Sequence, residues 1–157
     1  MKKLFLLLII LPALTGCKIM NIKELNYGQS NAAILYKEKL PNSPSNNHNT
    51  TDFKLNIIKR TDTIAAKIGN QFGVEYKIIN DENFSDMFQI TWIFPKGMCD
   101  INGKPLKKIT YDTVKLTNEY SYSNYTLETD NELVKGKWTF VLSYKGRKLY
   151  EKSFILI

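Results

Sequence analysis

The sequence has 157 residues, of which 43% are hydrophobic and 12% aromatic. This length suits one domain with its own apolar core and is too short for two comfortable ones. The formal net charge is +7, yet the basic residues are scattered between apolar ones, as on the solvated faces of strands. The nearest approach to a basic cluster is Lys104, Lys107 and Lys108, without a stripe of stacking aromatics, so we expect no nucleic-acid partner.

The first residues have the pattern of an export signal. Lys2 and Lys3 precede an apolar run from Leu4 to Ala13 that Pro12 interrupts. At ~1.5 Å per helical residue this run covers about half of the ~30 Å hydrocarbon core of a bilayer. The pattern therefore predicts a cleaved leader over residues 1–16 rather than a permanent transmembrane helix.

The leader ends in Leu14-Thr15-Gly16-Cys17, which resembles the lipobox of bacterial lipoproteins. The resemblance implies cleavage before Cys17, lipidation of its sulfur, and a membrane-anchored protein of the cell envelope with a tether over residues 17–21. Because Lys18 stands where an aspartate commonly retains lipoproteins at the inner membrane, the outer membrane is favoured if the host has two. The alternative is an ordinary secretory signal in which Cys17 is incidental.

Lipidation of Cys17 would leave Cys99 as the only free thiol of the exported chain. A single cysteine forms no internal disulfide, so apolar burial must hold the fold together. Cys99 follows an apolar strand pattern, and we expect it to be buried and inert. A reactive or intermolecular role is the alternative.

Alternating apolar and polar residues predict strands along most of residues 22–157. The expected strands are Ile22–Tyr27, Phe53–Ile57, Thr63–Ile68, Phe72–Ile79, Met87–Phe94, Thr110–Leu116, Tyr120–Leu127, Gly136–Tyr144 and Arg147–Leu156. Residues 32–40 fit either a strand or one helical turn. The polar, turn-rich segment 41–51 is expected to be an exposed loop.

This pattern contains no amphipathic helix of useful length, and its last two strands are joined by Lys145-Gly146 as a β-hairpin. Such an order predicts an all-β fold, an antiparallel immunoglobulin-like β-sandwich of about seven to nine short strands. Trp92 and Trp138 lie on the apolar sides of their strands and are expected in its core.

Several motifs of glycines and expected core aromatics follow one another along the chain. They are Gly69-x-x-Phe72-Gly73-Val74-x-Tyr76, Trp92-x-Phe94-Pro95, Glu132-Leu133-Val134-x-Gly136-x-Trp138-Thr139-Phe140, and Gly146-Arg147-Lys148-Leu149-x-x-x-Ser153-Phe154. Together they resemble a family of bacterial exported domains of unknown function. The resemblance implies a fold and brings no activity or catalytic residue with it.

The sequence contains few candidate catalytic or metal-binding residues. His48 is the sole histidine and sits in the polar segment, where a solvated role is expected, so no histidine-based metal cage or activated nucleophile can form. A carboxylate pair or a loop calcium site would draw on acidic residues that we expect to be solvated, namely Glu75, Asp81, Glu82, Asp86, Glu128, Asp130 and Glu132. We therefore expect no enzyme activity, no metal and no cofactor.

The segment Tyr120-Ser121-Tyr122-Ser123-Asn124-Tyr125 is the best candidate for binding. Amphipathic rings beside hydroxyl and amide groups favour recognition surfaces, although cross-strand packing selects the same residues. Tyr120, Tyr122 and Tyr125 are thus candidate binding residues. The sequence favours a non-enzymatic binding module for an envelope protein or glycan, and the alternative is an assembly accessory that pairs through a sheet edge.

Overall fold

The computed structural model describes residues 20–51 and 55–157. The predicted leader and the lipobox-like segment that ends in Cys17 lie outside these residues. Within them the chain forms eleven strands and one 3₁₀ helix: β1 (Asn21–Ser30), β2 (Ile34–Lys39), β3 (Asn47–Thr51), β4 (Ile57–Lys59), β5 (Thr63–Ile64), β6 (Gln71–Ile79), β7 (Ser85–Ile93), β8 (Lys108–Leu116), β9 (Tyr120–Thr126), η1 (Asp130–Glu132), β10 (Gly136–Tyr144) and β11 (Arg147–Leu156).

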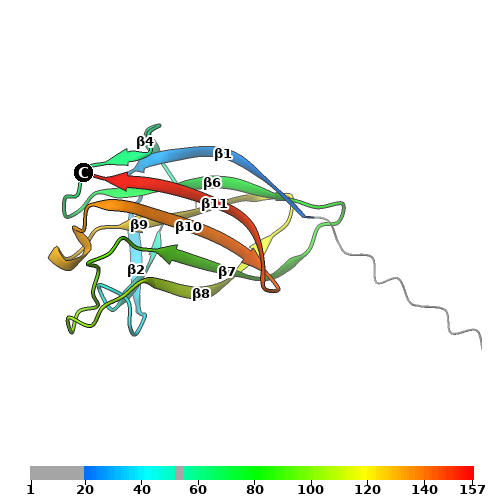
Figure 1. The fold of residues 1–157 in the computed structure, drawn as a ribbon. Coiled ribbons are helices and arrows are strands. Elements are labelled where there is room, and N and C mark those ends of the chain that lie inside the picture. Colours follow the sequence, from blue (N-terminus) through cyan, green and yellow to red (C-terminus); the bar gives the residue numbers. More distant parts are fainter. Residues whose placement is uncertain (1–19, 52–54) are drawn as a thin grey trace, which may run out of the picture.

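Nine of these strands build two sheets that pack face to face (Figure 1). One sheet has the order β4-β1-β6-β9 and the other the order β5-β11-β10-β7-β8. Neighbouring strands are antiparallel, except for the short parallel pair of β5 and β11. The expected immunoglobulin-like sandwich is confirmed, and β2 and β3 form a separate hairpin outside it.

The core consists of aromatic and aliphatic side chains that the period-two pattern directs between the sheets. Phe72 of β6 is fully buried and contacts four further rings, with centroid distances of 5.1–5.9 Å to Trp92, Tyr125, Trp138 and Phe154. Trp92 and Trp138 are 1% and 0% exposed, which confirms their expected place. Each such ring buries roughly 150–250 Å², so this cluster supplies much of the apolar burial.

Two strand glycines let β6 lie close to both neighbours. Gly73 pairs with Gly28 of β1 on one side and Asn124 of β9 on the other. A Cβ on Gly73 would lie 2.3 Å from the Ser123 carbonyl oxygen. Since no real contact is that short, any side chain here would push β9 away.

The prediction of an exposed loop over residues 41–51 is wrong. Its second half is strand β3, and Ser43 and Thr51 are buried. Asn42 and Asn46 take positive φ values of 64° and 57°, which asparagine tolerates, so the turn signals mark the tip of a hairpin rather than a free loop. Residues 34–39 form its other strand, which settles the ambiguity between strand and helical turn.

Other boundaries differ less. β1 begins at Asn21 and Met20 is buried in the core, so residues 20 and 21 belong to the packed domain together with residue 22. The predicted strand at residues 53–57 falls partly outside the described residues, and its end merges into β4. In the described part of the chain no helix is long and apolar enough to cross a membrane.

Candidate functional site

The site begins where the two sheets part along one flank of the sandwich. β8 and β9 follow each other in the chain but belong to different sheets, and they border this flank. A cavity of about 210 Å³ lies between them beneath β3, and a neighbouring hollow of about 170 Å³ continues toward the turn that joins them. Lys115 and Tyr122 line both. We call this region the β8/β9 flank.

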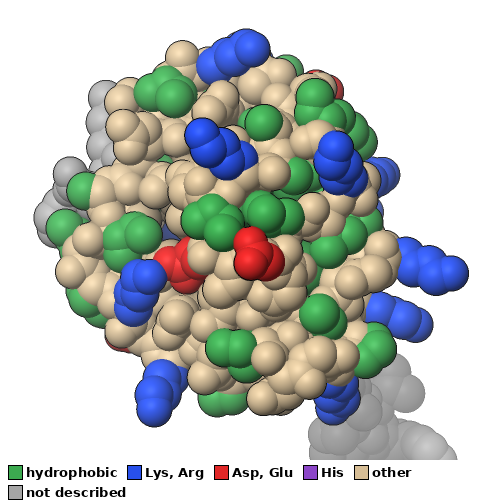
Figure 2. Space-filling view, turned by 90° about the vertical axis from the view of Figure 1, so that its left-hand side faces the viewer, with side chains coloured by type: hydrophobic (Ala, Val, Ile, Leu, Met, Phe, Trp, Pro, Cys, Tyr) green, Lys and Arg blue, Asp and Glu red, His purple; other side chains and the backbone are tan. Residues whose placement is uncertain are grey.

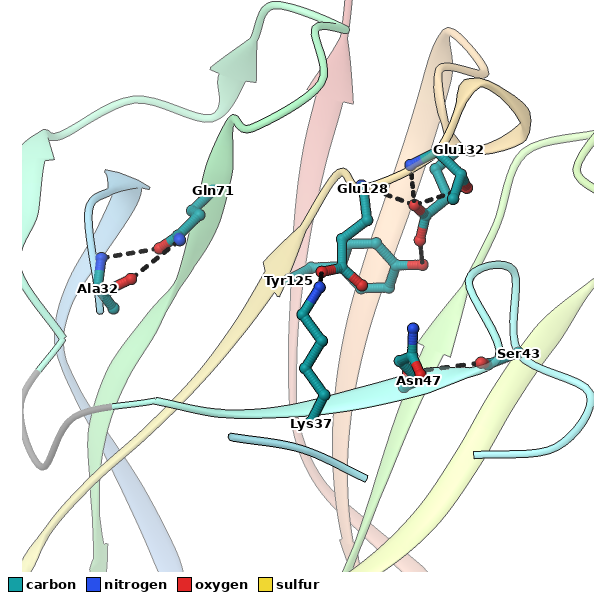
Figure 3. A network of polar contacts seen from close by, with 9 residues as sticks. Ala32, Lys37, Ser43, Asn47, Gln71, Tyr125, Glu128 and Glu132 are labelled. Atoms are coloured by element: carbon teal, nitrogen blue, oxygen red, sulfur yellow. Dashed lines mark hydrogen bonds and ion pairs between the residues drawn. The ribbon is translucent and has the colours of Figure 1, made fainter. Parts of the chain in front are cut away.

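Polar contacts hold the β2–β3 hairpin across this flank. The Gln71 side chain accepts a hydrogen bond from the Ala32 backbone N–H at 2.8 Å and donates one to its carbonyl at 3.0 Å, and Lys37 forms an ion pair with Glu128 (Figure 3). At the same open end of the hairpin as Ala32, where Ile34 pairs with Thr51, Thr51 exchanges two 3.2 Å hydrogen bonds with the Tyr122 hydroxyl. The hairpin thus roofs the cavity through contacts that each involve a side chain rather than through a shared sheet.

Lys115 carries the unusual electrostatics of the flank. The alternation of β8 directs it inward, where its ammonium donates a 3.0 Å hydrogen bond to the Tyr122 carbonyl and lies 5.9 Å from the Tyr76 ring centroid. Within the described residues it forms no ion pair with any carboxylate. Burial without a counter-charge lowers the pKa of Lys115 to about 8.

The rest of the cavity wall offers neutral polar groups. The His48 ring packs against Tyr111 at an interplanar angle of 57° with ring centroids 4.5 Å apart. Burial lowers the pKa of His48, the charge of Glu38 opposes this, and Lys115 adds a smaller lowering. The expectation of a solvated His48 is therefore wrong. Asn49 also lines the cavity, and its buried side-chain Oδ1 accepts no hydrogen bond from the described residues. The site combines one cation, several donors and one unused acceptor.

The three candidate tyrosines do not act together. Tyr120 and Tyr122 share a face of β9 with ring centroids 6.1 Å apart. The Tyr120 hydroxyl accepts a hydrogen bond from the Leu55 backbone N–H, and Tyr122 bonds Thr51, the last residue of β3. Tyr125 points the opposite way into the core, where its hydroxyl donates a 2.7 Å hydrogen bond to Glu132. The structure thus brings Tyr122 to the cavity. Tyr125 does not line the cavity, because its side chain lies in the core.

Two of the acidic residues expected at the surface are buried instead. Glu132 is 1% exposed, and its carboxylate accepts hydrogen bonds from the backbone N–H groups of Glu128 and Thr129 at 2.7 and 2.8 Å (Figure 3). Burial raises the pKa of Glu132 although these bonds oppose the rise. Glu75 is 9% exposed and accepts a hydrogen bond from Tyr120. Both carboxylates therefore form hydrogen bonds within the fold.

No group of three potential metal ligands occurs within residues 20–51 and 55–157. Cys99 is a free, half-buried thiol bridged through its backbone to Pro105, more exposed than expected.

At the end of the sandwich that Figure 2 shows, lysine and arginine side chains are scattered over the face and around its rim and do not merge into a basic patch.

Sequence reasoning missed Lys115, although a signal was present. Ile109, Tyr111 and Thr113 alternate with exposed residues on β8, and Lys115 continues the same inward parity. A lysine at an inward position of a strand is either a guard against edge pairing or a binding group, and the strand pattern alone does not separate the two.

Comparisons with known proteins give the family of the chain. Residues 22–156 match the domain of unknown function DUF3859. The chain belongs to this family. A solved structure that it resembles is an immunoglobulin-like protein from Pseudomonas aeruginosa, determined at 1.50 Å, with a TM-score of 0.61 and 22% identity over 90% of this chain and 100% of that one. No curated protein matches significantly. The likeness shows the fold alone.

Proposed function

We propose that this DUF3859 protein is a lipid-anchored, non-enzymatic binding module of the cell envelope whose ligand enters the β8/β9 flank. One observation carries the proposal: the roofed cavity of about 210 Å³ contains a cation and a buried acceptor that the described residues leave uncompensated. Buried polar groups without partners reduce stability, so a fold that keeps them has a use for them.

The anchor rests on the lipobox pattern at Cys17. Two or more acyl chains at ~0.8 kcal/mol per buried methylene make attachment lasting. Cells grown with labelled palmitate should incorporate it into the parent protein and into Cys99→Ser, the matched control, but not into Cys17→Ser. Label in Cys17→Ser, or none in the parent, would contradict the anchor.

The binding role is tested separately, by purifying the detergent-solubilised protein from its own envelope. A protein or glycan ligand should co-purify with the parent and be lost with Tyr122→Ala. Tyr36→Ala is the control, because Tyr36 is 53% exposed on the outer strand of the hairpin. Equal recovery with both variants would count against this flank, as would a large fall in the Tm of Tyr122→Ala.

The structure gives less support to pairing through a sheet edge. β8 is the longest strand at a free edge of the sandwich in the described residues, and an edge strand is the surface that such pairing needs. Its inward Lys115 is the kind of charge that protects natural edges from pairing. A binding role at the cavity is therefore the better account of this flank.

A further inference from the structure

The cavity beneath the hairpin defines a chemical class of ligand. Its volume of about 210 Å³ has room for about seven water molecules, which suits one sugar-sized molecule and excludes a long chain folded within it. Polar side chains form most of the wall: His48, Asn49, Thr113, Lys115, Tyr122 and Ser123. An apolar ligand would desolvate all of these without pairing them.

Lys115 requires an anion. Its ammonium has three donors, and the structure assigns one of them to the Tyr122 carbonyl at 3.0 Å. The nearest carboxylate by register is Asp86 on β7, which is instead engaged by the Tyr144 hydroxyl at 2.6 Å and by Lys145 at 3.7 Å. A carboxylate entering the cavity would accept the remaining donors of Lys115 as charge-assisted hydrogen bonds.

Asn49 requires a donor. Its Oδ1 is buried at the cavity wall and accepts no hydrogen bond from the described residues. A simple carboxylate such as acetate provides no donor at neutral pH, whereas a hydroxylated acid does. The cavity therefore offers complementary groups for a negative charge and a hydroxyl on the same small molecule.

We infer that the β8/β9 flank binds an acidic sugar, whose carboxylate pairs with Lys115 and whose hydroxyl donates to Asn49. This inference rests on the proposed function and names the class of ligand for the same site. Tyr111 and Tyr122 both line the cavity, and aromatic rings beside polar donors suit the mixed surface of a sugar.

The test measures binding of D-glucuronate, D-glucose and acetate to the full-length protein in detergent by isothermal titration calorimetry. Glucuronate and glucose differ only in the carboxylate, and acetate lacks the hydroxyls. We expect glucuronate to bind at least tenfold more tightly than either. Equal affinity for glucose overturns the role of Lys115, and equal affinity for acetate overturns that of Asn49. Absence of glucuronate binding overturns the inference as a whole.

Variants locate the site. Lys115→Met should lose glucuronate binding at least tenfold, whereas Lys108→Met, which removes the same charge from an exposed position on the same strand, should not. Equal losses in both variants, or unchanged binding in Lys115→Met, overturn the inference. Since glucose binding or co-purification of an envelope ligand can survive these results, failure here is distinguishable from failure of the proposed function.

A pH series on the parent protein keeps the test independent of the variants. Binding should weaken at least tenfold between pH 7 and pH 10 as Lys115 loses its proton, because its pKa is lowered to about 8. The other titratable groups around this region are His48 on β3, Tyr76 on β6, Asp86 on β7, Tyr111 on β8 and Tyr122 on β9, together with Glu38 on β2, which acts on His48, and Glu119 and Tyr120, which line the adjoining hollow. Of these groups only His48 can carry a positive charge, and its lowered pKa leaves it largely neutral above pH 7, so pH-independent binding overturns the inference.

Discussion

The sandwich has two flanks, and each contains an inward-facing lysine in a different electrostatic setting. On the β1/β11 flank, Lys152 lies 3.5 Å from a carboxylate oxygen of Glu24 and 3.0 Å from the Tyr27 ring centroid, and Arg60 lies 3.7 Å from the same carboxylate. On the β8/β9 flank, Lys115 faces tyrosines and a backbone carbonyl. One fold thus neutralises one lysine internally and leaves the other for a charge from outside.

The difference also appears in how each flank is closed. Residues of the sandwich strands themselves close the β1/β11 flank, where Tyr150 donates a hydrogen bond to Glu24. The β8/β9 flank is roofed by a hairpin that belongs to neither sheet. A closed flank built from paired charges stabilises the fold, whereas a roofed flank with an unpaired charge reduces stability and offers a place to bind.

The largest effect should come from breaking the core that both flanks share. Phe72→Ala removes a fully buried ring that contacts four others, and we expect a loss of about 3–5 kcal/mol in the free energy of unfolding. Urea denaturation of parent and variant measures it. A loss below about 1 kcal/mol would mean that the aromatic cluster does not hold the sheets together.

The next effect has the opposite sign. Lys115→Met should stabilise the protein near neutral pH, because the lowering of the Lys115 pKa from 10.5 to about 8 corresponds to a destabilisation of roughly 3 kcal/mol. The unfolded chain binds the proton more tightly, so this cost is complete below pH 8, fades as the pH rises from 8 to 10.5, and is absent above 10.5. Urea denaturation at pH 6 and pH 10 should show a shrinking difference between the two proteins. A variant less stable than the parent at pH 6 would refute this view of the flank.

The equivalent change on the other flank should destabilise. Lys152→Met removes a cation from Glu24, and we expect a loss of about 1 kcal/mol, because this pair is partly exposed and Arg60 remains beside the carboxylate. Thermal denaturation at low and high salt measures it, and salt should narrow the gap between parent and variant. Stabilisation by Lys152→Met would erase the contrast between the flanks.

The smallest change in stability should come from giving the β8/β9 flank its own carboxylate. Thr113 lines the cavity two residues before Lys115 on the same face of β8. In Thr113→Glu the new charge should raise the pKa of Lys115, while the free energy of unfolding changes by less than about 1 kcal/mol. Competitive amine labelling against pH reports that pKa, and Thr113→Gln is the control. An unchanged pKa would show that the two groups do not meet.

The period-two pattern predicted the sandwich well because its strands bury large side chains on one face. Trp92, Trp138 and Phe72 each lie where alternation places them. The hairpin escaped prediction for a physical reason. Its second strand is made of Asn47, His48, Asn49 and two threonines, which pair through their backbones and pack through polar contacts, so no apolar alternation marks it.

The candidate site was found only in part for the same reason. The tyrosine-rich segment identified β9, and Tyr122 does reach the cavity. The state of Lys115 depends on which strands surround it and on the absence of an ion pair between Lys115 and any described carboxylate, and both are properties of the tertiary arrangement. The sequence likewise predicted a solvated Glu132, because the contacts that bury its carboxylate come from Tyr125 and from the turn before η1.

The attachment of the hairpin has a consequence for how the molecule moves. Each of its polar contacts with the sandwich involves at least one side chain, whereas β6 is bonded through its backbone along its length to both β1 and β9. Backbone amides of β2 and β3 should therefore exchange with deuterium far sooner than those of β6. The roof can then lift through a local fluctuation, and a molecule can enter or leave while the two sheets stay intact.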